Sequence, residues 1–126
     1  MKESILSEKS FLFALRVVNL YKYLLAEHKE YVLSKQVLRS GTSVGANIEE
    51  AKHAQSKVDF IHKLSIAQKE ASETNFWIRL LQQSEFLKEK LAISLINDCD
   101  EIQRMLTSSI KTSKANLEKE NLDKTR

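Results

Sequence analysis

Two pairs of carboxylate and imidazole side chains have the spacing that helical metal centres use. Glu50 and His53 lie three residues apart in "EAKH", and Asp59 and His62 repeat this spacing in "DFIH". Residues three apart share one face of a helix, and Glu-x-x-His pairs build the di-iron sites of some four-helix bundles. The pairs flank one short connection, so an antiparallel helix hairpin would bring them to the same end.

The rest of the sequence does not complete such a centre. His62 falls nearly opposite the apolar stripe of its own helix, His53 lies at a helix end, and no inward glutamates supply the other ligands. No G-x-S-x-G motif is present, and Cys99 has the pattern of a small core residue. We therefore expect no metal, no cofactor, no small-molecule substrate and no enzymatic activity.

The composition predicts an all-α chain. Its 126 residues suit one domain, and without proline and with only two glycines it lacks most of the residues that build tight β-turns. No apolar run is long enough for a signal peptide or a membrane span. We expect a cytoplasmic protein without a membrane partner.

Apolar residues recur at helical spacing in four segments. These are about 9–27, 34–53, a third that begins after a cap formed by Ser56 and Asp59, and about 85–113 after Ser84. Short connections make successive helices antiparallel, which predicts an up-down-up-down four-helix bundle over residues 1–113. Residues 114–126 are charged and lack an apolar face, so we expect a disordered tail.

Each segment carries an apolar stripe that should face the core. The first carries two neighbouring stripes, so it requires burial over more than half of its circumference. The third has the most regular pattern. The stripes are Phe11, Ala14, Val18, Tyr21 and Leu25 beside Phe13, Val17, Leu20 and Leu24; Val37, Gly41, Val44, Ile48 and Ala51; Phe60, Leu64, Ala67, Ala71, Thr74, Ile78 and Leu81; and Leu87, Leu91, Leu95, Ile102, Met105 and Leu106.

A polar stripe runs along the second segment beside its apolar stripe. Polar groups at a helix interface need partners. Our hypothesis is that Arg39 pairs with Glu50 or with Glu73 across a helix interface, and that the other polar residues complete the hydrogen bonds. Such a network fixes helix register more than it adds stability. The stripe consists of Gln36, Arg39, Ser43, Asn47 and Glu50.

Gly41 and Gly45 lie inside the second helix, although each glycine costs roughly 1 kcal/mol there against alanine. Their spacing lowers the side-chain height along one flank, which lets another helix approach closely. The stretch "GTSVGAN" matches neither common phosphate-binding loop pattern. We interpret the two glycines as sites of close helix packing.

The third helix carries a second set of large apolar residues opposite its core stripe. Such groups on a face that should be solvated indicate a partner surface. The alternative is that Phe76 and Trp77 lie on the bundle flanks under long side chains. Together with the double stripe of the first helix, this set favours a homo-oligomer. The arc consists of Ile66, Phe76, Trp77 and Leu80, with Glu73 among them.

These segments resemble the four-helix-bundle proteins encoded in intervening sequences of bacterial 23S ribosomal RNA genes, over roughly residues 10–110. The resemblance implies a bundle similar to homopentameric barrels, with no established enzymatic activity. That family is also similar to the accessory variability determinant of diversity-generating retroelements, which works with a reverse transcriptase and binds nucleic acid. The residues that carry the resemblance are Gln36 and Arg39; Ser43, Asn47, Ile48 and Glu50; and Phe60, Leu64, Ile66, Ala67, Ser72 and Glu73.

Two functions remain open on the sequence. The first is a non-enzymatic oligomeric scaffold that presents a surface to a protein partner. The second is an accessory factor that binds RNA or DNA, with Arg16, Lys22 and Arg79 as candidate phosphate contacts. The net charge is only +3 and no segment concentrates basic residues, so the second function requires a ring that repeats this charge in every subunit.

Overall fold

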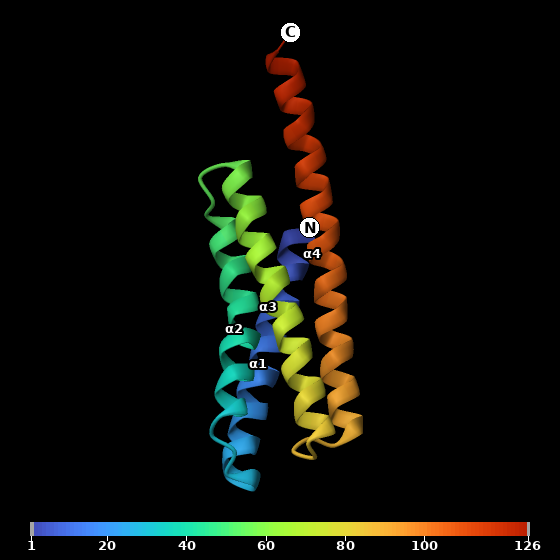
Figure 1. The fold of residues 1–126 in the computed structure, drawn as a ribbon. Helices are drawn as coiled ribbons and strands as arrows, with labels where there is room; N and C mark the ends of the chain where they lie inside the picture. Colours follow the sequence, from blue (N-terminus) through green and yellow to red (C-terminus); the bar gives the residue numbers. More distant parts are fainter. Residues whose placement is uncertain (1, 126) are drawn as a thin grey trace.

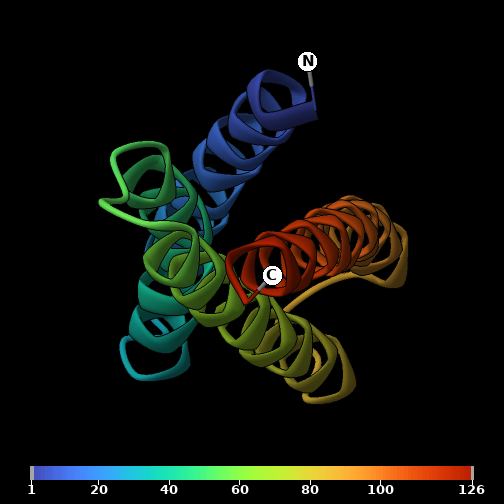
Figure 2. The same cartoon turned by 90° about the horizontal axis from the view of Figure 1, so that it is seen from above.

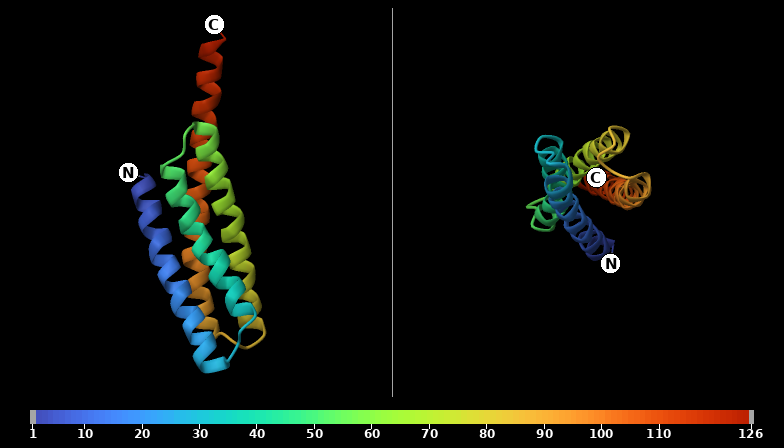
Figure 3. Two further views of the ribbon diagram at one scale, coloured as in Figure 1. Left: turned by 90° about the vertical axis from the view of Figure 1, so that its left-hand side faces the viewer. Right: turned by 90° about the horizontal axis from the view of Figure 1, so that it is seen from below.

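The computed structural model describes residues 2–125, with side chains from Ile5 onward, and these residues form four helices. Successive helices run in opposite directions (Figure 1, Figure 3). The expected all-α four-helix bundle is therefore confirmed. The helices are α1 (Lys2–His28), α2 (Leu33–Lys52), α3 (Lys57–Gln83) and α4 (Glu89–Lys124).

Each helix packs against the two helices beside it around the bundle. Within residues 2–125, the diagonal pairs α1–α3 and α2–α4 make no close backbone contact. The α2–α3 contact is the most extensive and the α1–α4 contact the least extensive. Figure 2, which views the bundle along its length, shows α1 and α4 diverging from one another. The bundle is thus tightest between α2 and α3 and loosest along α1 and α4.

The core is one continuous apolar cluster to which all four helices contribute. The regular stripe of α3 faces it as predicted, except that Phe60 is half-buried and Ile61 takes the inward place. No helix of the described residues is long and apolar enough to cross a membrane. The largest fully buried side chains include Phe13, Leu6, Leu24, Leu64, Ile78, Leu81, Leu95, Ile102 and Leu106.

The start of α3 has the predicted cap. The Asp59 backbone N–H donates to Ser56 Oγ at 3.1 Å, and the Asp59 carboxylate accepts the Gln55 N–H at 3.4 Å. A side-chain oxygen in this position satisfies one of the N–H groups that have no partner within the helix. The short polar connection between α2 and α3 therefore ends at Ser56, as the capping pattern predicts.

The prediction for α1 was wrong in two respects. The helix begins at Lys2 and not near residue 9. Of its two apolar stripes, only the one containing Phe13 and Val17 is buried; Phe11 of the other stripe is 64% exposed. Periodicity shows that a face is apolar but not which neighbour covers it. Among the described residues the backbone of α1 lies close only to α2 and, sparsely, to α4, so the second stripe is left on the flank.

The predicted start of α4 was also wrong. Ser84 ends α3 and does not cap the next helix. Glu85 follows in a left-handed conformation with φ of 69°; its N–H donates to Gln82 O at 3.1 Å, and the Phe86 N–H donates to Leu81 O at 2.9 Å. These two bonds form a Schellman motif, in which glycine is usual at the left-handed position. Glutamate at this position gave no sequence signal for the helix end.

The end of α4 lies beyond the predicted boundary at residue 113. The segment expected to be disordered, 114–126, is helical as far as Lys124. It projects past the other helices (Figure 1, Figure 3), and its side chains are mostly exposed. Lysine, glutamate, leucine and alanine favour helix, and a helix that is already nucleated extends at little cost. The lack of an apolar face in this segment therefore did not mean that the segment is non-helical.

Candidate functional site between α2 and α3

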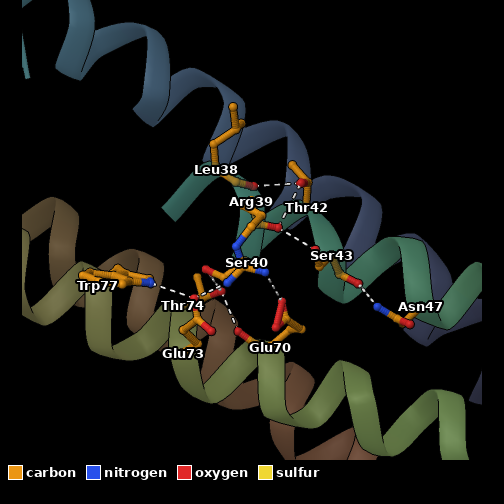
Figure 4. Close-up of polar contacts among 10 residues, drawn as sticks. All are labelled: Leu38, Arg39, Ser40, Thr42, Ser43, Asn47, Glu70, Glu73, Thr74 and Trp77. Carbon is orange, nitrogen blue, oxygen red and sulfur yellow. Dashed lines mark hydrogen bonds and ion pairs between the residues drawn. The ribbon is translucent and has the colours of Figure 1, made fainter. Parts of the chain in front are cut away.

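Arg39 joins α2 to α3 through two carboxylates (Figure 4). Its Nη1 donates to Glu70 Oε2 at 3.0 Å, and its Nη2 pairs with Glu73 Oε2. Glu70 and Glu73 are three residues apart, so they project from one face of α3. The guanidinium group therefore spans one turn of α3 and fixes its register against α2.

Trp77 extends this network along α3. Its indole Nε1–H donates to Glu73 Oε2 at 3.0 Å, and its ring packs edge to face against Phe76 with centroids 5.1 Å apart. The Trp77 hydrogen bond, followed by the bond and charge of Arg39, holds the pKa of Glu73 below its ordinary value. The same carboxylate raises the pKa of Arg39. Glu73 is thus held as an anion between two donors.

The ion pairs of Arg39 lie at the surface. Its side chain is 52% exposed, and those of Glu70 and Glu73 are 17% and 35% exposed. Exposed pairs of this kind contribute up to about 1 kcal/mol, because solvent screens the charges and ordering the side chains costs entropy. The network therefore contributes mainly a fixed geometry between α2 and α3.

Ser40 and Thr74 form a buried polar contact beside this network. Their Oγ atoms are 2.9 Å apart, and Thr74 Oγ1 also lies 2.8 Å from the backbone oxygen of Glu70. A carbonyl can only accept and a hydroxyl has one proton. The arrangement that satisfies both hydroxyls therefore has Thr74 donating to Glu70 and Ser40 donating to Thr74. Both residues are fully buried, so the α2–α3 interface holds one hydroxyl pair within its apolar interior and has a charged rim.

Three other residues of the predicted network do not join it. Ser43 Oγ donates to Arg39 O at 2.6 Å and Asn47 Nδ2 donates to Ser43 O at 2.8 Å, so both bond to their own helix, as short polar side chains often do. The Gln36 side chain is exposed and has no hydrogen bond among the described residues. None of the three bonds to the guanidinium group of Arg39, whose partners are Glu70 and Glu73.

Glu50, the other predicted partner of Arg39, pairs with Lys63 Nζ at 3.0 Å. Eleven residues separate it from Arg39, which is about 16 Å along a helix. This distance excludes a direct pair within the chain, where the structure contains the alternative with Glu73. Glu70 was missed, although its spacing from Glu73 on one face of α3 was a usable signal.

The two glycines lie where α1 approaches α2. A Cβ atom at Gly41 would come within 2.7 Å of both methyl groups of Val17, and one at Gly45 would lie 3.4 Å from Ser10 O. Both contacts are within the chain. The close approach therefore belongs to the bundle itself.

The apolar arc of α3 is narrower than the sequence indicates. Phe76 is 48% and Leu80 36% exposed, whereas Ile66 and Trp77 are half-buried and Trp77 packs against the core. The covered-flank alternative thus holds for Trp77 but not for Phe76. We refer to Phe76 and Leu80 as the α3 ridge.

A larger exposed apolar surface lies on α1 and was missed. Its side chains lie on the side of the helix away from Phe13 and Val17, and each is between 47% and 64% exposed. Phe11 belongs to one of the two stripes expected to face the core, whereas Ile5, Leu12 and Leu15 fall outside both. We call this set the outer face of α1; it consists of Ile5, Phe11, Leu12 and Leu15.

The carboxylate and imidazole pairs do not converge. His53 and His62 are exposed, Glu50 is paired with Lys63, and the Asp59 carboxylate accepts a hydrogen bond from the Gln55 N–H. Residues 2–125 contain no group of three or more His, Cys, Asp or Glu side chains placed to hold a metal ion.

Two of the three candidate phosphate contacts already have partners. Arg16 Nη1 pairs with Asp98 Oδ2 at 2.6 Å across the α1–α4 seam, and Arg79 Nε donates to Asn75 Oδ1 at 2.9 Å. Lys22 is exposed. The three cations come from α1 and α3, the diagonal pair whose backbones make no close contact within residues 2–125.

Comparison with known proteins agrees with the fold and with the sequence motifs. The sequence model described as 23S rRNA-intervening sequence protein matches residues 2–108. A crystal structure of a protein with unknown function, from the S23 ribosomal protein family of Bacteroides thetaiotaomicron VPI-5482, is 54% identical with a TM-score of 0.87. The alignment covers 88% of this chain and 99% of that one. No curated protein matches.

Proposed function

The chain belongs to the 23S rRNA-intervening sequence protein family, and we propose that it acts as a non-enzymatic scaffold that self-associates through exposed apolar helix faces. The relative of known structure that it matches is described as a protein with unknown function. The observation that carries this proposal is the outer face of α1. Leu12 and Leu15 are 53% and 47% exposed on a helix whose opposite side is already buried. A helix that is apolar on both sides requires a second partner.

Exposed apolar groups are common singly, but clusters of them mark interaction sites. The outer face of α1 gathers four large side chains within three turns, one of them aromatic. Aromatic residues are enriched in protein interfaces, where they contribute a large share of the binding energy. This composition favours a protein partner over solvent.

The α3 ridge gives the second copy a complementary place to bind. Because α1 and α3 are diagonal in the bundle, their outward surfaces lie on opposite sides of the chain. A contact between the α1 face of one copy and the α3 ridge of the next is heterologous, and such contacts generate closed rings when the rotation between copies allows it. A ring is the arrangement that the sequence resemblance implies, with five copies.

Nucleic-acid binding has weaker support as a function. Arg16 and Arg79 are engaged by Asp98 and Asn75, and the net charge of +3 per chain is small. Phosphate binding by a ring would require those cations to exchange their partners. Ultraviolet absorbance of the purified protein for copurified nucleic acid tests this alternative on the same sample.

Light scattering of the purified chain tests the proposal. We expect a mass of several chains, and a monomeric mass for the double variant Leu12→Lys with Leu15→Lys, because burying two ammonium groups costs more than the contact gains. The matched control adds the same two charges at the exposed positions Ser94 and Asn97 of α4, which have the same spacing but lie outside the α1 face and the α3 ridge, and should keep the assembly. A monomeric wild-type protein would overturn the proposal.

A further inference from the structure

An open cleft of about 600 Å³ lies where the α2–α3 connection faces the outer half of α4. One wall is the end of α2 and the start of α3, with Lys52, Gln55 and Lys57. The other wall is α4, which Figure 1 shows rising past the α2–α3 connection. The residues that line the cleft include none from the Arg39 network, the outer face of α1 or the α3 ridge.

The polar groups of the cleft are suited to an anion. Two lysines line it, and none of its eleven lining residues is a carboxylate. On the α4 wall, four side chains that can donate a hydrogen bond have no such bond to any described residue: Ser109, Thr112, Ser113 and Asn116. Elsewhere in the bundle, such hydroxyl groups donate hydrogen bonds to backbone carbonyls of the preceding turn, as in Thr42, Ser43, Ser65 and Thr74.

The floor of the cleft is apolar. Phe60 is half-buried there beside Ala51 and Ala54. A small adjoining cavity continues beneath the same residues toward Leu6 and Leu64. A flat ring laid against Phe60 would be removed from water, since aromatic rings stack and bury apolar area together. The cleft thus combines an apolar floor with a cationic, hydroxyl-rich rim.

The lysines are held in pairs that a stronger anion can replace. Lys57 Nζ pairs with Glu120 Oε1, and Lys52 Nζ pairs with Glu49 Oε1 at 3.1 Å. All four side chains are between 38% and 59% exposed, and pairs with this exposure contribute little. A dianionic phosphate with several acceptor oxygens forms stronger charge-assisted hydrogen bonds than one carboxylate.

We propose that this cleft binds a phosphomonoester attached to a flat ring, the chemistry of a nucleoside monophosphate. The phosphate contacts Lys57 and Lys52 together with the hydroxyls of α4. The ring lies against Phe60. The same chemistry is offered by a free mononucleotide and by the phosphorylated end of a nucleic-acid strand.

Amide chemical-shift perturbation and calorimetry of the full chain test the site with adenosine monophosphate, adenosine and inorganic phosphate. Adenosine monophosphate should perturb the amide shifts of residues 52–60 and 109–116. It should bind at least roughly tenfold more tightly than adenosine, which lacks the phosphate, or inorganic phosphate, which lacks the ring. A 5′-phosphorylated oligoadenylate, tested in parallel, distinguishes the two sources. Tight binding of the strand with weak binding of the mononucleotide assigns the site to a strand end.

Two variants separate a binding role from a structural one. Lys57→Gln should weaken adenosine monophosphate roughly tenfold by removing a charged donor, whereas Glu120→Gln should tighten it roughly two- to fivefold by releasing Lys57 from an exposed pair. Lys69→Gln, at an exposed lysine on the same helix outside the cleft, should change nothing. The proposal fails if no phosphate ester perturbs the cleft residues, or if Lys57→Gln and Lys69→Gln bind alike.

Discussion

Val17 of α1 and Gly41 of α2 lie so close that no side chain fits between them. A Cβ atom at Gly41 would lie 2.7 Å from both methyl carbons of Val17 and 3.2 Å from its Cβ. Val17 is completely buried, and a β-branched side chain has little rotamer freedom with which to move aside. This contact offsets the helix-forming cost of glycine at position 41.

Gly41→Ala and Gly45→Ala should therefore have opposite effects on the free energy of unfolding. Alanine at 41 forces α1 and α2 apart and should cost about 1–3 kcal/mol, as overpacking does. Alanine at 45 meets atoms of Ser10 at ordinary contact distances, the nearest being its backbone O at 3.4 Å, so the gain in helix propensity, roughly 1 kcal/mol, should make that variant neutral or more stable. Urea unfolding measures both. Equal destabilisation would mean that the closeness at Val17 is not what requires glycine.

The buried hydroxyls of Ser40 and Thr74 should behave as a coupled pair. Thr74→Val keeps the shape but leaves Ser40 Oγ buried without its partner, which should cost about 1–3 kcal/mol. Ser40→Ala leaves Thr74 bonded to Glu70 O and should cost less. The double variant should be more stable than Thr74→Val alone. Additive single and double effects in a urea-unfolding cycle would contradict the coupling.

Glu73 should contribute a pH-dependent part of the stability. The hydrogen bond from Trp77, and then Arg39, lowers its folded-state pKa below the ordinary value of 4.5. A lowered folded pKa means that the unfolded state binds the proton more readily, so the stabilisation is present above pH 4.5 and is lost as the pH falls through the folded pKa. Thermal melts at pH 6 and pH 3 should show a smaller loss for Glu73→Gln than for the wild type. A pH dependence identical in both proteins would exclude this contribution.

Cys99 should be unreactive in the folded protein. Burial, followed by the charges of Asp100 and Asp98, raises the pKa of its thiol to about 12, and Sγ donates to Ala71 O at 3.2 Å. The thiolate is the reactive form. A disulfide-exchange reagent such as Ellman's should find no thiol at neutral pH and one per chain in guanidinium chloride. Rapid labelling of the native protein would show that α3 and α4 separate readily.

The class of fold could be predicted because the helical periodicity and the composition agree. The stripe of α3 and the Ser56 cap depend only on residues that are close together in the chain, so the sequence of one segment is enough to predict them. The inward side of α1 could not be chosen, because both of its sides are apolar and the choice depends on how far α4 covers it. The turn at Glu85 was missed because its left-handed conformation is occupied by a residue that does not favour it.

The candidate site was predicted in part for the same reason. Arg39 could be singled out from its position beside the core stripe, but its partner depends on the register between α2 and α3. Register is a property of two helices together, so the pattern of one helix left Glu50 and Glu73 as alternatives. The separation along the helix decides against Glu50, and the spacing of Glu70 from Glu73 explains why one guanidinium engages both.

The order in which the helices pair has a kinetic consequence. Three of the four helix contacts join segments adjacent in the chain, and only the α1–α4 contact must close a loop that spans most of the sequence. Local contacts form before distant ones because closing a short loop costs less entropy. With no proline to isomerise slowly, the chain should fold in one rapid phase that ends when α1 and α4 meet. The same seam should be the first to open, and amide exchange should be fastest on the helix surfaces that line it.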